Sequence, residues 1–408
     1  MLLKEAELNS SANDLHVLIA GGGIGGLTTA LCLAKRGCRV SVFEQASEFS
    51  EVGAGIQLSP NCSRVLHDLG LEEQLRTKAF LPEGSQFRHW RTGEVISESV
   101  LGETALKKYG MPYYHIHRGD LLKILVDATK NRSEIELHVN ASVGSFHEEK
   151  TARNGGVTIQ VGDTHHEGDM LIGADGIRSV VRAGLWGEQN PRFTGNVAWR
   201  AMVPVSRLPK GLIRPMSTAW WGPRKHFVHY YVRRGDFVNC VCVVEKAGWD
   251  VESWTEPGDY AELKSDFAGW HSDIHQLIDN ADRDSLFKWA LYDRPPMRHW
   301  GQGRVTLLGD ACHPTLPFMA QGAAMAIEDA AVIAGCLASN DDTAASLQHY
   351  EALRRGRTAS IQNGSRRNAT VFHLSGVKAW LRNRAARSAG NHTMDKLYRY
   401  NALEATHV

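Results

Sequence analysis

The sequence has few cysteines, and their spacing does not match a redox or metal-binding motif. Seven cysteines are scattered through 408 residues, and none pairs with another at the spacing of a redox dithiol or a zinc knuckle. We therefore expect them to be reduced, small apolar side chains. Histidine pairs such as His165 with His166 also lack an accompanying metal-ligand pattern. The sequence predicts no metal site.

Charge of one sign and long apolar runs are also missing. The formal net charge is only +1, which gives no general attraction to nucleic acid. The best apolar segment, Ala323–Ala338, contains Glu328 and Asp329, so it is not an uninterrupted membrane-spanning run. Residues 1–14 are polar and lack the apolar core of a signal peptide. These absences predict a cytoplasmic protein with no membrane span and no nucleic-acid partner.

A glycine-rich turn near the start of the chain is the first positive signal. Residues 21–26 read Gly-Gly-Gly-Ile-Gly-Gly. They follow an expected strand, His16–Ala20, and precede an expected helix, Leu27–Lys35. Such a strand, turn and helix hold a pyrophosphate at the helix N-terminus. A phosphate-binding loop for nucleoside triphosphates is excluded because Leu27 stands where that motif needs lysine.

The residues of this turn have separate roles. Gly21 permits the tight turn, Gly23 lets the backbone approach a pyrophosphate, and Gly26 lets the helix pack against the strand. A second expected strand, Arg39–Phe43, ends at Glu44, where a carboxylate accepts hydrogen bonds from a ribose. Together these residues predict a dinucleotide-binding site.

Two further segments are suited to lie close to such a ligand. The loop Gly53–Asn61 has glycines that let the backbone approach a ligand, and a helix is expected over Asn61–Leu69. Arg118 lies near the start of another expected helix, Leu121–Ala128, where its guanidinium could meet a phosphate. The alternative is a surface ion pair between Arg118 and Asp120.

An acidic turn follows an expected buried strand in the middle of the chain. The run Met170–Ile172 leads into Asp175-Gly176, which is turn chemistry, and Arg178 and Arg182 come shortly after. A turn of this kind is usually structural. The nearby arginine pair could instead position a phosphate-rich nucleotide.

A second acidic turn lies far downstream. The expected strand Gly303–Asp310 ends in a carboxylate that could accept hydrogen bonds from a polyhydroxyl chain. A long helix is expected over Ala324–Leu337, and its positive N-terminus could face a negatively charged or electron-rich ring edge. Pro314 and Pro317 bracket the connecting loop, whose rigid backbone could fix a carbonyl toward a ligand.

Between these turns, residues 195–294 change to short strands and tryptophans. A hairpin is expected from His226–Val232 and Phe237–Val244. Alternation along the first strand places His226 and Tyr230 on one face, which should line a sheet-covered cavity. The alternative is that these aromatic residues only form a core. The arginine-rich segment Arg354–Arg399 predicts solvated helix faces or a contact with a partner subunit, without a ligand site.

The glycine turn, the Asp175-Gly176 motif with Arg178 and Arg182, and the run from Gly309 to Pro314 resemble the single-component, class A flavoprotein aromatic hydroxylases. The three motifs occur in that family's order and spacing, and the similarity runs from about residue 15 to Ala402. The salicylate hydroxylase and 3-hydroxybenzoate 6-hydroxylase branches are the most similar in appearance.

The resemblance implies an α/β fold in three parts. A Rossmann-like FAD-binding domain of the GR2 type takes residues 1–80, 111–195 and 295–345. A mixed β-sheet substrate domain, inserted as residues 81–110 and 196–294, covers it. A helical segment, residues 346–408, ends the chain. By analogy alone, a homodimer is expected.

The resemblance also implies FAD in an extended form, with NADH or NADPH as a co-substrate. The chain has no second GxGxxG turn, so the nicotinamide nucleotide is expected to bind transiently. The residues expected to bind FAD are Gly21, Gly23, Gly25, Gly26, Glu44, Gln45, Gly55, Arg118, Asp175, Asp310, Gly322 and Ala323.

The implied reaction is a monooxygenation. NAD(P)H reduces the flavin, O2 adds to give a C4a-hydroperoxide, and the distal oxygen passes to an electron-rich aromatic ring. The residues expected to be catalytic are His226, Tyr230 and Pro317. A histidine with a near-neutral pKa suits removal of a phenolic proton. The alternative for His226 is a hydrogen-bonded core histidine.

The expected substrate is a phenolic aromatic acid, either salicylate-like or a hydroxybenzoate. The resemblance leaves 3-hydroxybenzoate 6-hydroxylation and heteroaromatic hydroxylation of the hydroxypyridine or quinolone type as alternatives. The chain has Pro317 where 3-hydroxybenzoate 6-hydroxylases carry glutamine, which disfavours the first of these. Epoxidation, halide oxidation and a non-catalytic flavin-binding or redox-sensing role are further possibilities.

Overall fold

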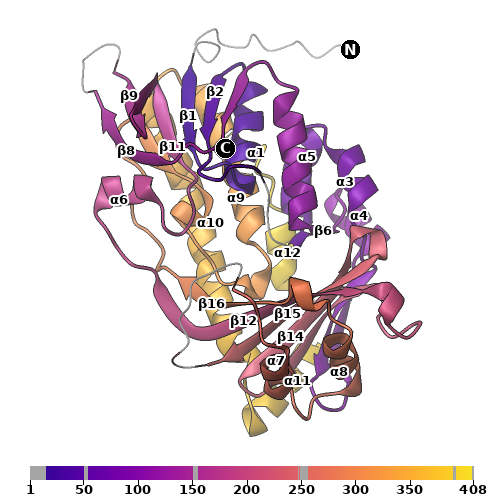
Figure 1. The fold of residues 1–408 in the computed structure, drawn as a ribbon. Helices are drawn as coiled ribbons and strands as arrows, with labels where there is room; N and C mark the ends of the chain where they lie inside the picture. Colours follow the sequence, from indigo (N-terminus) through magenta and orange to yellow (C-terminus); the bar gives the residue numbers. More distant parts are fainter. Residues whose placement is uncertain are drawn as a thin grey trace, which may run out of the picture.

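The structure, a computed structural model, describes residues 15–49, 54–149, 155–246, 248, 256–388 and 392–406. Within these ranges the strands form four sheets, and the two largest have five and seven strands. In Figure 1 the five-stranded sheet lies at the top and the seven-stranded sheet at the bottom. Helix α10 (Thr343–Phe372) joins the two layers, because its beginning packs in the core of the first and its end in the core of the second.

The five-stranded sheet is entirely parallel, and its strands in spatial order are β17 (Val305–Leu307), β11 (Met170–Gly173), β1 (His16–Ala20), β2 (Arg39–Phe43) and β7 (Ile135–His138). These strands are short apolar runs, as expected of parallel strands covered by helices. The chain moves from β1 to β2 on one side and returns to β11 on the other. The carboxyl ends of β1 and β11 therefore open a crevice of the kind in which α/β sheets bind ligands.

Helices pack against this sheet. Helix α1 (Ile24–Ala34) lies between α5 (Arg118–Lys130) and α9 (Gly322–Ser339). By length and composition α9 is apolar enough to cross a membrane, with a mean hydropathy of 1.4 over its most apolar window, but 78% of that window is buried inside the fold. We interpret α9 as the core helix of this layer, because its apolar side chains already pack on protein.

The seven-stranded sheet is mixed, and its strands in spatial order are β16 (Phe287–Asp293), β12 (Arg192–Pro204), β15 (Phe237–Glu245), β14 (Lys225–Val232), β13 (Met216–Gly222), β4 (Gly84–His89) and β5 (Val95–Val100). Only the β13 and β4 pair is parallel among these strands. Strands from two distant parts of the chain therefore share one sheet, and on this basis we propose the domain boundaries given above.

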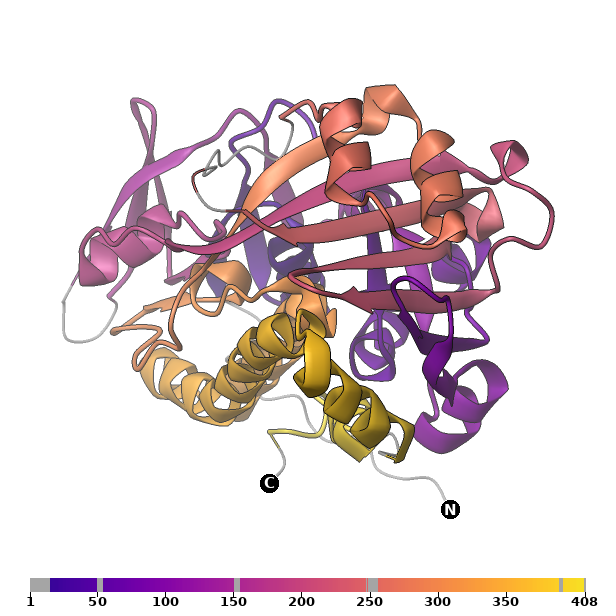
Figure 2. The ribbon, with the colours of Figure 1, turned by 90° about the horizontal axis from the view of Figure 1, so that it is seen from below.

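The two faces of the seven-stranded sheet differ. One face packs on α7 (Tyr260–Asp266) and α8 (Ser272–Asp279) through fully buried side chains such as Trp199, Trp220 and Phe227. Figure 2 shows these two helices on one side of the sheet, and α10 with α11 (Gly376–Ser388) on the other. Trp199 and Trp220 therefore form part of a hydrophobic core, as the alternative for the aromatic residues predicts. The opposite face of the sheet is the one that can line a cavity.

Smaller elements complete the described chain. The short strands are β3 (Gly55–Leu58), β6 (Tyr114–His117), β8 (Val143–Glu148), β9 (Val157–Val161) and β10 (Thr164–Gly168). The remaining α-helices are α2 (Pro60–Asp68), α3 (Glu72–Lys78), α4 (Gly102–Tyr109), α6 (Val180–Trp186) and α12 (His392–Tyr398). Single-turn helices are η2 (Val205–Arg207), η3 (Arg233–Gly235), η4 (Arg283–Ser285), η5 (Gly309–Ala311) and η6 (Pro317–Met319).

The prediction of a loop over Gly53–Asn61 is wrong for most of that segment. Gly53 lies outside the described residues, but β3 pairs antiparallel with β6, and α2 begins at Pro60. Proline is favoured in the first turn of a helix because it needs no hydrogen-bond acceptor there. The strand is missed because its partner, β6, lies far away in the sequence.

Several predicted ends are shifted by a few residues. Helix α1 begins at Ile24 and not at Leu27, because Gly25 and Gly26 already belong to its first turn. Helix α5 begins at Arg118, and the predicted strand Gly303–Asp310 is reduced to β17, followed by the single turn η5. Glycine lowers the predicted helix propensity but does not prevent a helix that is packed on both sides.

Candidate functional site

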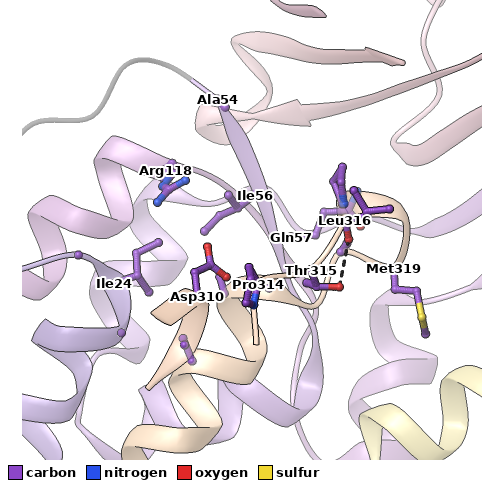
Figure 3. A pocket seen from close by; sticks show the side chains of 18 of the residues that line it. Ile24, Ala54, Ile56, Gln57, Arg118, Asp310, Pro314, Thr315, Leu316 and Met319 are labelled. Carbon is purple, nitrogen blue, oxygen red and sulfur yellow. Dashed lines mark hydrogen bonds between the residues drawn. The ribbon is translucent and has the colours of Figure 1, made fainter. Parts of the chain in front are cut away.

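A cavity of about 900 Å³ extends from the turn after β1 to the seven-stranded sheet. Single ligand sites usually have cavities of about 300 to 1,000 Å³, so this volume is at the upper end. Figure 3 shows part of it, with Arg118 above Asp310, and Ile24 and Pro314 on either side. All predicted site residues line this cavity except Gly26.

The glycine turn is shaped by two close backbone approaches. Gly21 has a φ of +105°, and a Cβ there would lie 2.4 Å from the carbonyl oxygen of Ala174. A Cβ on Gly26 would lie 2.0 Å from the carbonyl oxygen of Gly21, so Gly26 permits helix packing and does not face the cavity. By contrast, nothing lies within 4 Å of a Cβ on Gly23. The turn therefore leaves space for a ligand at the N-terminus of α1, which has no side-chain cap.

Glu44 follows β2, and its side chain hydrogen-bonds to the glycine turn. One carboxylate oxygen accepts the Gly22 N–H at 2.8 Å, and the other accepts the Ala46 N–H at 2.9 Å. Each oxygen retains a lone pair, so a sugar hydroxyl can still donate to this carboxylate. Gln45 lies beside it in the cavity wall.

The Asp175-Gly176 turn brings a second carboxylate to the cavity. One oxygen of Asp175 accepts the backbone N–H groups of Val180 and Val181 at 2.7 and 3.1 Å. The other oxygen is buried and has no hydrogen-bond partner among the described residues. Burial raises the pKa of Asp175, against the hydrogen bonds from Ser179 and from this backbone. A buried acceptor without a donor fits a ligand that supplies one.

The proposed phosphate role for Arg182 is wrong. Its side chain is buried and donates to the carbonyl oxygens of Ala311 at 2.8 Å and Ile177 at 2.7 Å, so it ties the two acidic turns together. Arg178, in contrast, is exposed and lines the cavity.

Asp310 and Arg118 line the middle of the cavity. Asp310 is open to the cavity, but the surrounding protein desolvates its carboxylate and raises its pKa, against the opposing effects of His313 and Arg118. Arg118 is the first residue of α5, as predicted, and its N–H donates to the Ala54 carbonyl at 2.8 Å. Asp120, the alternative partner for Arg118, accepts from Arg233 at 3.2 Å.

The loop from Pro314 to Ala320 forms the next part of the wall. The Pro314 carbonyl accepts from the Gln362 side chain at 2.9 Å, and the Pro317 carbonyl accepts the Ala320 N–H at 3.0 Å. Each of these two carbonyls therefore already accepts one hydrogen bond within the protein, and a carbonyl of this loop directed at a ligand stays a prediction. Pro317 itself lines the cavity. Ala320 has a φ of +52°, a left-handed conformation that alanine adopts at a cost of roughly 1 to 2 kcal/mol.

Helix α9 begins at Gly322, two residues after Ala320. Gly322 and Ala323 line the cavity in its first turn, and no side chain caps this helix end. Gln321 does not cap it; its side chain is buried and bonds to Ser59 at 2.9 Å and to Asn61 at 3.1 Å. The positive end of α9 is thus directed into the cavity, where it favours a negative or electron-rich group.

The far end of the cavity lies against β14. His226, Val228 and Tyr230 all face it, as the alternation predicts. Gly55 also lines it, but a Cβ there would lie 2.7 Å from the Tyr230 ring, so Gly55 allows β3 to pack on this tyrosine. Arg200 reaches the same end from β12, with its guanidinium carbon 3.8 Å from the Trp289 ring centroid.

The expectation of a near-neutral pKa for His226 is wrong. Its side chain is almost fully buried, and burial together with His373 lowers its pKa well below the usual value. The imidazole is therefore neutral and can accept a proton only with help. Its Nδ1 lies 2.8 Å from Nε2 of His373, whose Nδ1 lies 2.9 Å from a carboxylate oxygen of Glu245.

The sequence reasoning missed Arg200 and His373. Arg200 had a signal, because it is the only charged residue in the otherwise apolar run Val197–Val203. His373 had none, since only the packing of the end of α10 on β14 brings it to His226.

The interpretation of Arg354–Arg399 as solvated faces is wrong at its start. Arg354 is fully buried, with ion pairs of 2.7 Å to both Glu328 and Asp329 of α9. Arg357 also pairs with Glu328, at 2.6 Å. Because buried charges need partners, these arginines hold α10 against α9 and support the cavity wall.

All seven cysteines are free and buried, and burial raises the pKa of Cys62 to about 12. Within the described ranges, no group of three or more His, Cys, Asp or Glu side chains is placed to hold a metal ion.

A glycine turn at a switch point, two acidic turns and an inner cavity beside a mixed sheet define a dinucleotide-binding protein with a second ligand site. The family model described as "FAD binding domain" matches residues 14–365. The chain belongs to this family, and its cofactor is FAD.

Relatives and solved structures agree with this assignment. The 3-amino-4-hydroxybenzoate 2-monooxygenase PtnB3 of Streptomyces platensis is 39% identical over 382 residues, with 93% of this chain and 94% of the relative covered. The 3-hydroxybenzoate 6-hydroxylase of Polaromonas naphthalenivorans is 37% identical, with 92% of each chain covered. The structure of HpxO from Klebsiella pneumoniae with FAD and uric acid has a TM-score of 0.82 and 26% identity, covering 95% of this chain and 97% of that one.

The residues present fit an extended FAD. The open space at Gly23 and the free end of α1 suit a pyrophosphate, and Glu44 suits a ribose. The buried acceptor of Asp175 and the desolvated carboxylate of Asp310 suit hydroxyl donors.

Proposed function

We propose that this chain, an FAD-dependent monooxygenase that consumes NAD(P)H and O2, hydroxylates a phenolic aromatic acid of the salicylate or hydroxybenzoate type beside His226. The composition of the far end of the cavity carries the proposal. There a buried cation, Arg200, and a neutral imidazole, His226, lie among aromatic and aliphatic side chains.

Each of these groups has a matching part of the substrate. Arg200 would bind the carboxylate, since guanidinium and carboxylate form strong charge-assisted hydrogen bonds. His226 would accept the phenolic proton and so enrich the ring in electrons. Tyr230, Trp289 and Phe318 would hold the ring by their aromatic faces and edges, and would exclude water.

The predicted cofactor residues keep their roles as part of this proposal. Residues Gly21, Gly23, Gly25, Glu44 and Gln45 would hold the ADP half of FAD. Farther along the cofactor would lie Arg118, Asp175, Asp310, Gly322 and Ala323. We assign Gly26 to helix packing and Gly55 to the Tyr230 contact. When bound, the flavin takes electrons from NAD(P)H and activates O2, and the protein residues position the ring that receives the oxygen.

A second candidate is hydroxylation of a heteroaromatic ring, such as a hydroxypyridine or a quinolone. It is favoured by the Klebsiella pneumoniae structure, whose second ligand is uric acid, a fused nitrogen heterocycle. The same cavity groups would serve this reaction, because a ring hydroxyl on a heterocycle also donates a proton to a base.

The test is effector-stimulated oxidation of NADH and of NADPH by the FAD-loaded enzyme. The panel contains salicylate, 3-hydroxybenzoate, 3-amino-4-hydroxybenzoate and 6-hydroxynicotinate, with oxygen uptake and product identification. We expect a benzoate to accelerate oxidation and to be hydroxylated. Hydroxylation of 6-hydroxynicotinate alone would favour the second candidate. If no member of the panel accelerates the oxidation of NADH or NADPH, both candidate substrate classes are wrong.

We also propose a cytoplasmic homodimer. Helix α11 exposes Val377, Trp380 and Leu381, with relative exposures of 74%, 59% and 53%. Large apolar side chains grouped on one exposed helix are typical of a surface that a partner covers.

A further inference from the structure

Three side chains form a hydrogen-bonded line from the inner cavity to the surface. His226 lines the cavity, and its Nδ1 lies 2.8 Å from Nε2 of His373. Nδ1 of His373 lies 2.9 Å from Glu245. The exposed fraction of the side chain rises from 3% at His373 to 38% at Glu245. The line therefore starts at the proposed substrate and ends in solvent.

The tautomers along this line follow from its outer end. Glu245 as a carboxylate can only accept, so Nδ1 of His373 carries a proton and donates it. Nε2 of the neutral His373 ring is then an acceptor, and Nδ1 of His226 must donate to it. This leaves Nε2 of His226 without a proton. Each donor in the line thus points outward, and the inner nitrogen is a base.

The burial of His226 explains why it needs hydrogen-bonded partners to accept a proton. The rings of Phe318 and Phe372 lie edge-on to His226, at centroid distances of 5.1 and 5.4 Å. Because His226 is buried and its pKa is lowered, it holds a proton poorly by itself. A proton that it accepts is stabilised only if the charge moves toward the carboxylate.

The charged groups around the line agree with outward transfer. Glu245, on β15, acts to raise the pKa of His373, although burial and Arg382 of α11 keep that pKa lowered. Arg224, in the turn before β14, pairs with the other oxygen of Glu245 at 3.3 Å. Arg382 donates to the carbonyls of Val371 and Phe372 and so fixes the end of α10. Arg382 thus opposes a positive charge that stays on His373.

We propose that His226, His373 and Glu245 form a proton relay that carries the phenolic proton of the bound substrate to solvent. The phenolic O–H bond breaks and an N–H bond forms at Nε2 of His226. The Nδ1 proton of His226 passes to Nε2 of His373, and the Nδ1 proton of His373 passes to Glu245, which releases it to water. When the hydroxylated product regains its phenol, the same steps run in reverse and the tautomers are restored. One proton leaves and one returns, and no electron moves.

In this scheme His373 and Glu245 are positioning residues, because neither touches the substrate. The inference rests on the proposed function, since it needs a phenolic ligand at His226. It is tested by Glu245→Gln, which keeps the size of the side chain but not its charge, and by His373→Gln, which can hydrogen-bond but cannot relay a proton. Glu245→Asp is the conservative variant. Glu98→Gln is the control, because Glu98 lies in the same sheet, is ion-paired and is 36% exposed.

The first measurement uses oxidised, FAD-loaded enzyme without NAD(P)H. Ultraviolet difference spectra of bound 3-hydroxybenzoate and 3-amino-4-hydroxybenzoate are recorded between about pH 6 and about pH 10, where phenols ionise. We expect the wild type and the E98Q enzyme to hold phenolate at lower pH than free ligand does. A relay acts on the rate of proton transfer, so after stopped-flow mixing at neutral pH the phenolate should form about tenfold or more slowly in E245Q and H373Q than in the wild type.

The second measurement is the pH profile of hydroxylation. E245Q and H373Q should be slower by about tenfold or more at neutral pH, a typical loss for proton transfer, and should recover at high pH, where phenolate binds directly. E245D should retain most of the activity. Phenolate formation and pH profiles like those of the wild type in both glutamine variants would overturn the relay and leave the proposed function intact. If the wild type binds neither phenol, the relay is wrong, whereas the proposed function fails only if no benzoate of the panel is hydroxylated.

Discussion

His226 illustrates how its surroundings decide what one side chain can do. The sequence places it on the correct strand face, but the spacing of residues contains no information about its burial or about His373. In the structure, burial keeps the imidazole neutral, which suits a base that acts only when a phenol is present. The environment of His226, and not the residue type alone, therefore determines its acid-base chemistry.

Substitution of His226 should separate proton transfer from cofactor binding. His226→Asn should lower the rate of hydroxylation by about 100-fold or more, the usual contribution of a general base, while FAD remains bound. Flavin absorbance checks the second point, and single-turnover product formation checks the first. Unchanged coupled turnover would reduce His226 to a core residue.

Arg200 should determine the preference for an acid. Arg200→Gln should weaken binding of 3-hydroxybenzoate by about tenfold or more, because it removes a charge-assisted hydrogen bond worth roughly 1.5 to 3 kcal/mol. Binding of 3-hydroxybenzamide, which has no charge, should hardly change. Arg192→Gln is the control, since Arg192 lies on the same strand but is 68% exposed. Equal losses for the acid and the amide would contradict the role of Arg200.

Asp310 should make the folded apoprotein less stable at neutral pH, and it should also strengthen the binding of FAD. Its pKa is raised in the folded state, so its contribution to stability is present below the pKa of the unfolded chain and is lost as the pH rises through the folded value. Asp310→Asn should therefore raise the melting temperature of the apoprotein at neutral pH and weaken FAD binding. The gain should vanish below about pH 4. Asp127→Asn on the surface should change neither quantity, and an unstable Asp310→Asn apoprotein would refute this account.

At the level of elements, the pair of α9 and α10 shows what local pattern cannot provide. The long apolar pattern predicts α9 well, but Glu328 and Asp329 read as interruptions of it. In the structure they are the partners of Arg354. Asp329 also lies 2.6 Å from Nε2 of His313, next to the loop that lines the cavity. From the sequence alone, an arginine-rich helix is predicted to be solvated, because the acidic helix that packs against it is not apparent.

Removal of the Arg354 guanidinium should therefore lower the stability of the folded protein. Arg354→Met keeps the length of the side chain but leaves two buried carboxylates without this partner, which should lower the free energy of unfolding by about 3 to 5 kcal/mol. Arg355→Met, which removes a 47% exposed side chain one position along, should change it by less than about 1 kcal/mol. Urea unfolding of both variants measures the difference. Similar values would mean that the buried network contributes no more than the surface pair.

Other elements were predictable where the signal is local. Strands β1 and β2 have the predicted bounds, and the hairpin of β14 and β15 is found within a residue at each end. Strand β3 was missed because its pairing with β6 is distant in sequence. The Pro314 carbonyl is bonded to Gln362 because α10 covers that loop, which sequence spacing does not reveal.

At the level of the whole molecule, the two sheets together create the site. The turns of the parallel sheet carry their motifs in the sequence and could be assigned to one extended cofactor. The inner end depends on which face of the mixed sheet is left uncovered by α7 and α8, and on where α10 ends. Those are tertiary facts, so the sequence predicts the turns that line the nucleotide end of the cavity and the inner end only in part. Which of these residues bind FAD stays a prediction.

The proposed dimer is also a property of the whole molecule. Sedimentation of the FAD-loaded enzyme should give twice the mass of 45.1 kDa. Trp380→Glu should shift the equilibrium toward the monomer, because it places a charge in the exposed apolar group of α11. Leu106→Glu, at an exposed apolar position on α4, is the control. A monomeric wild type would disprove the dimer without affecting the proposed reaction.

The central claim is that this cavity transfers an oxygen atom from O2 to a phenolic aromatic acid. A single turnover of the FAD-loaded enzyme with NAD(P)H, ¹⁸O2 and each benzoate of the panel tests it most directly, with the product read by mass spectrometry. The account predicts a hydroxylated benzoate that carries one ¹⁸O atom. Complete conversion of the reducing equivalents to hydrogen peroxide, with every benzoate recovered unchanged, would contradict it.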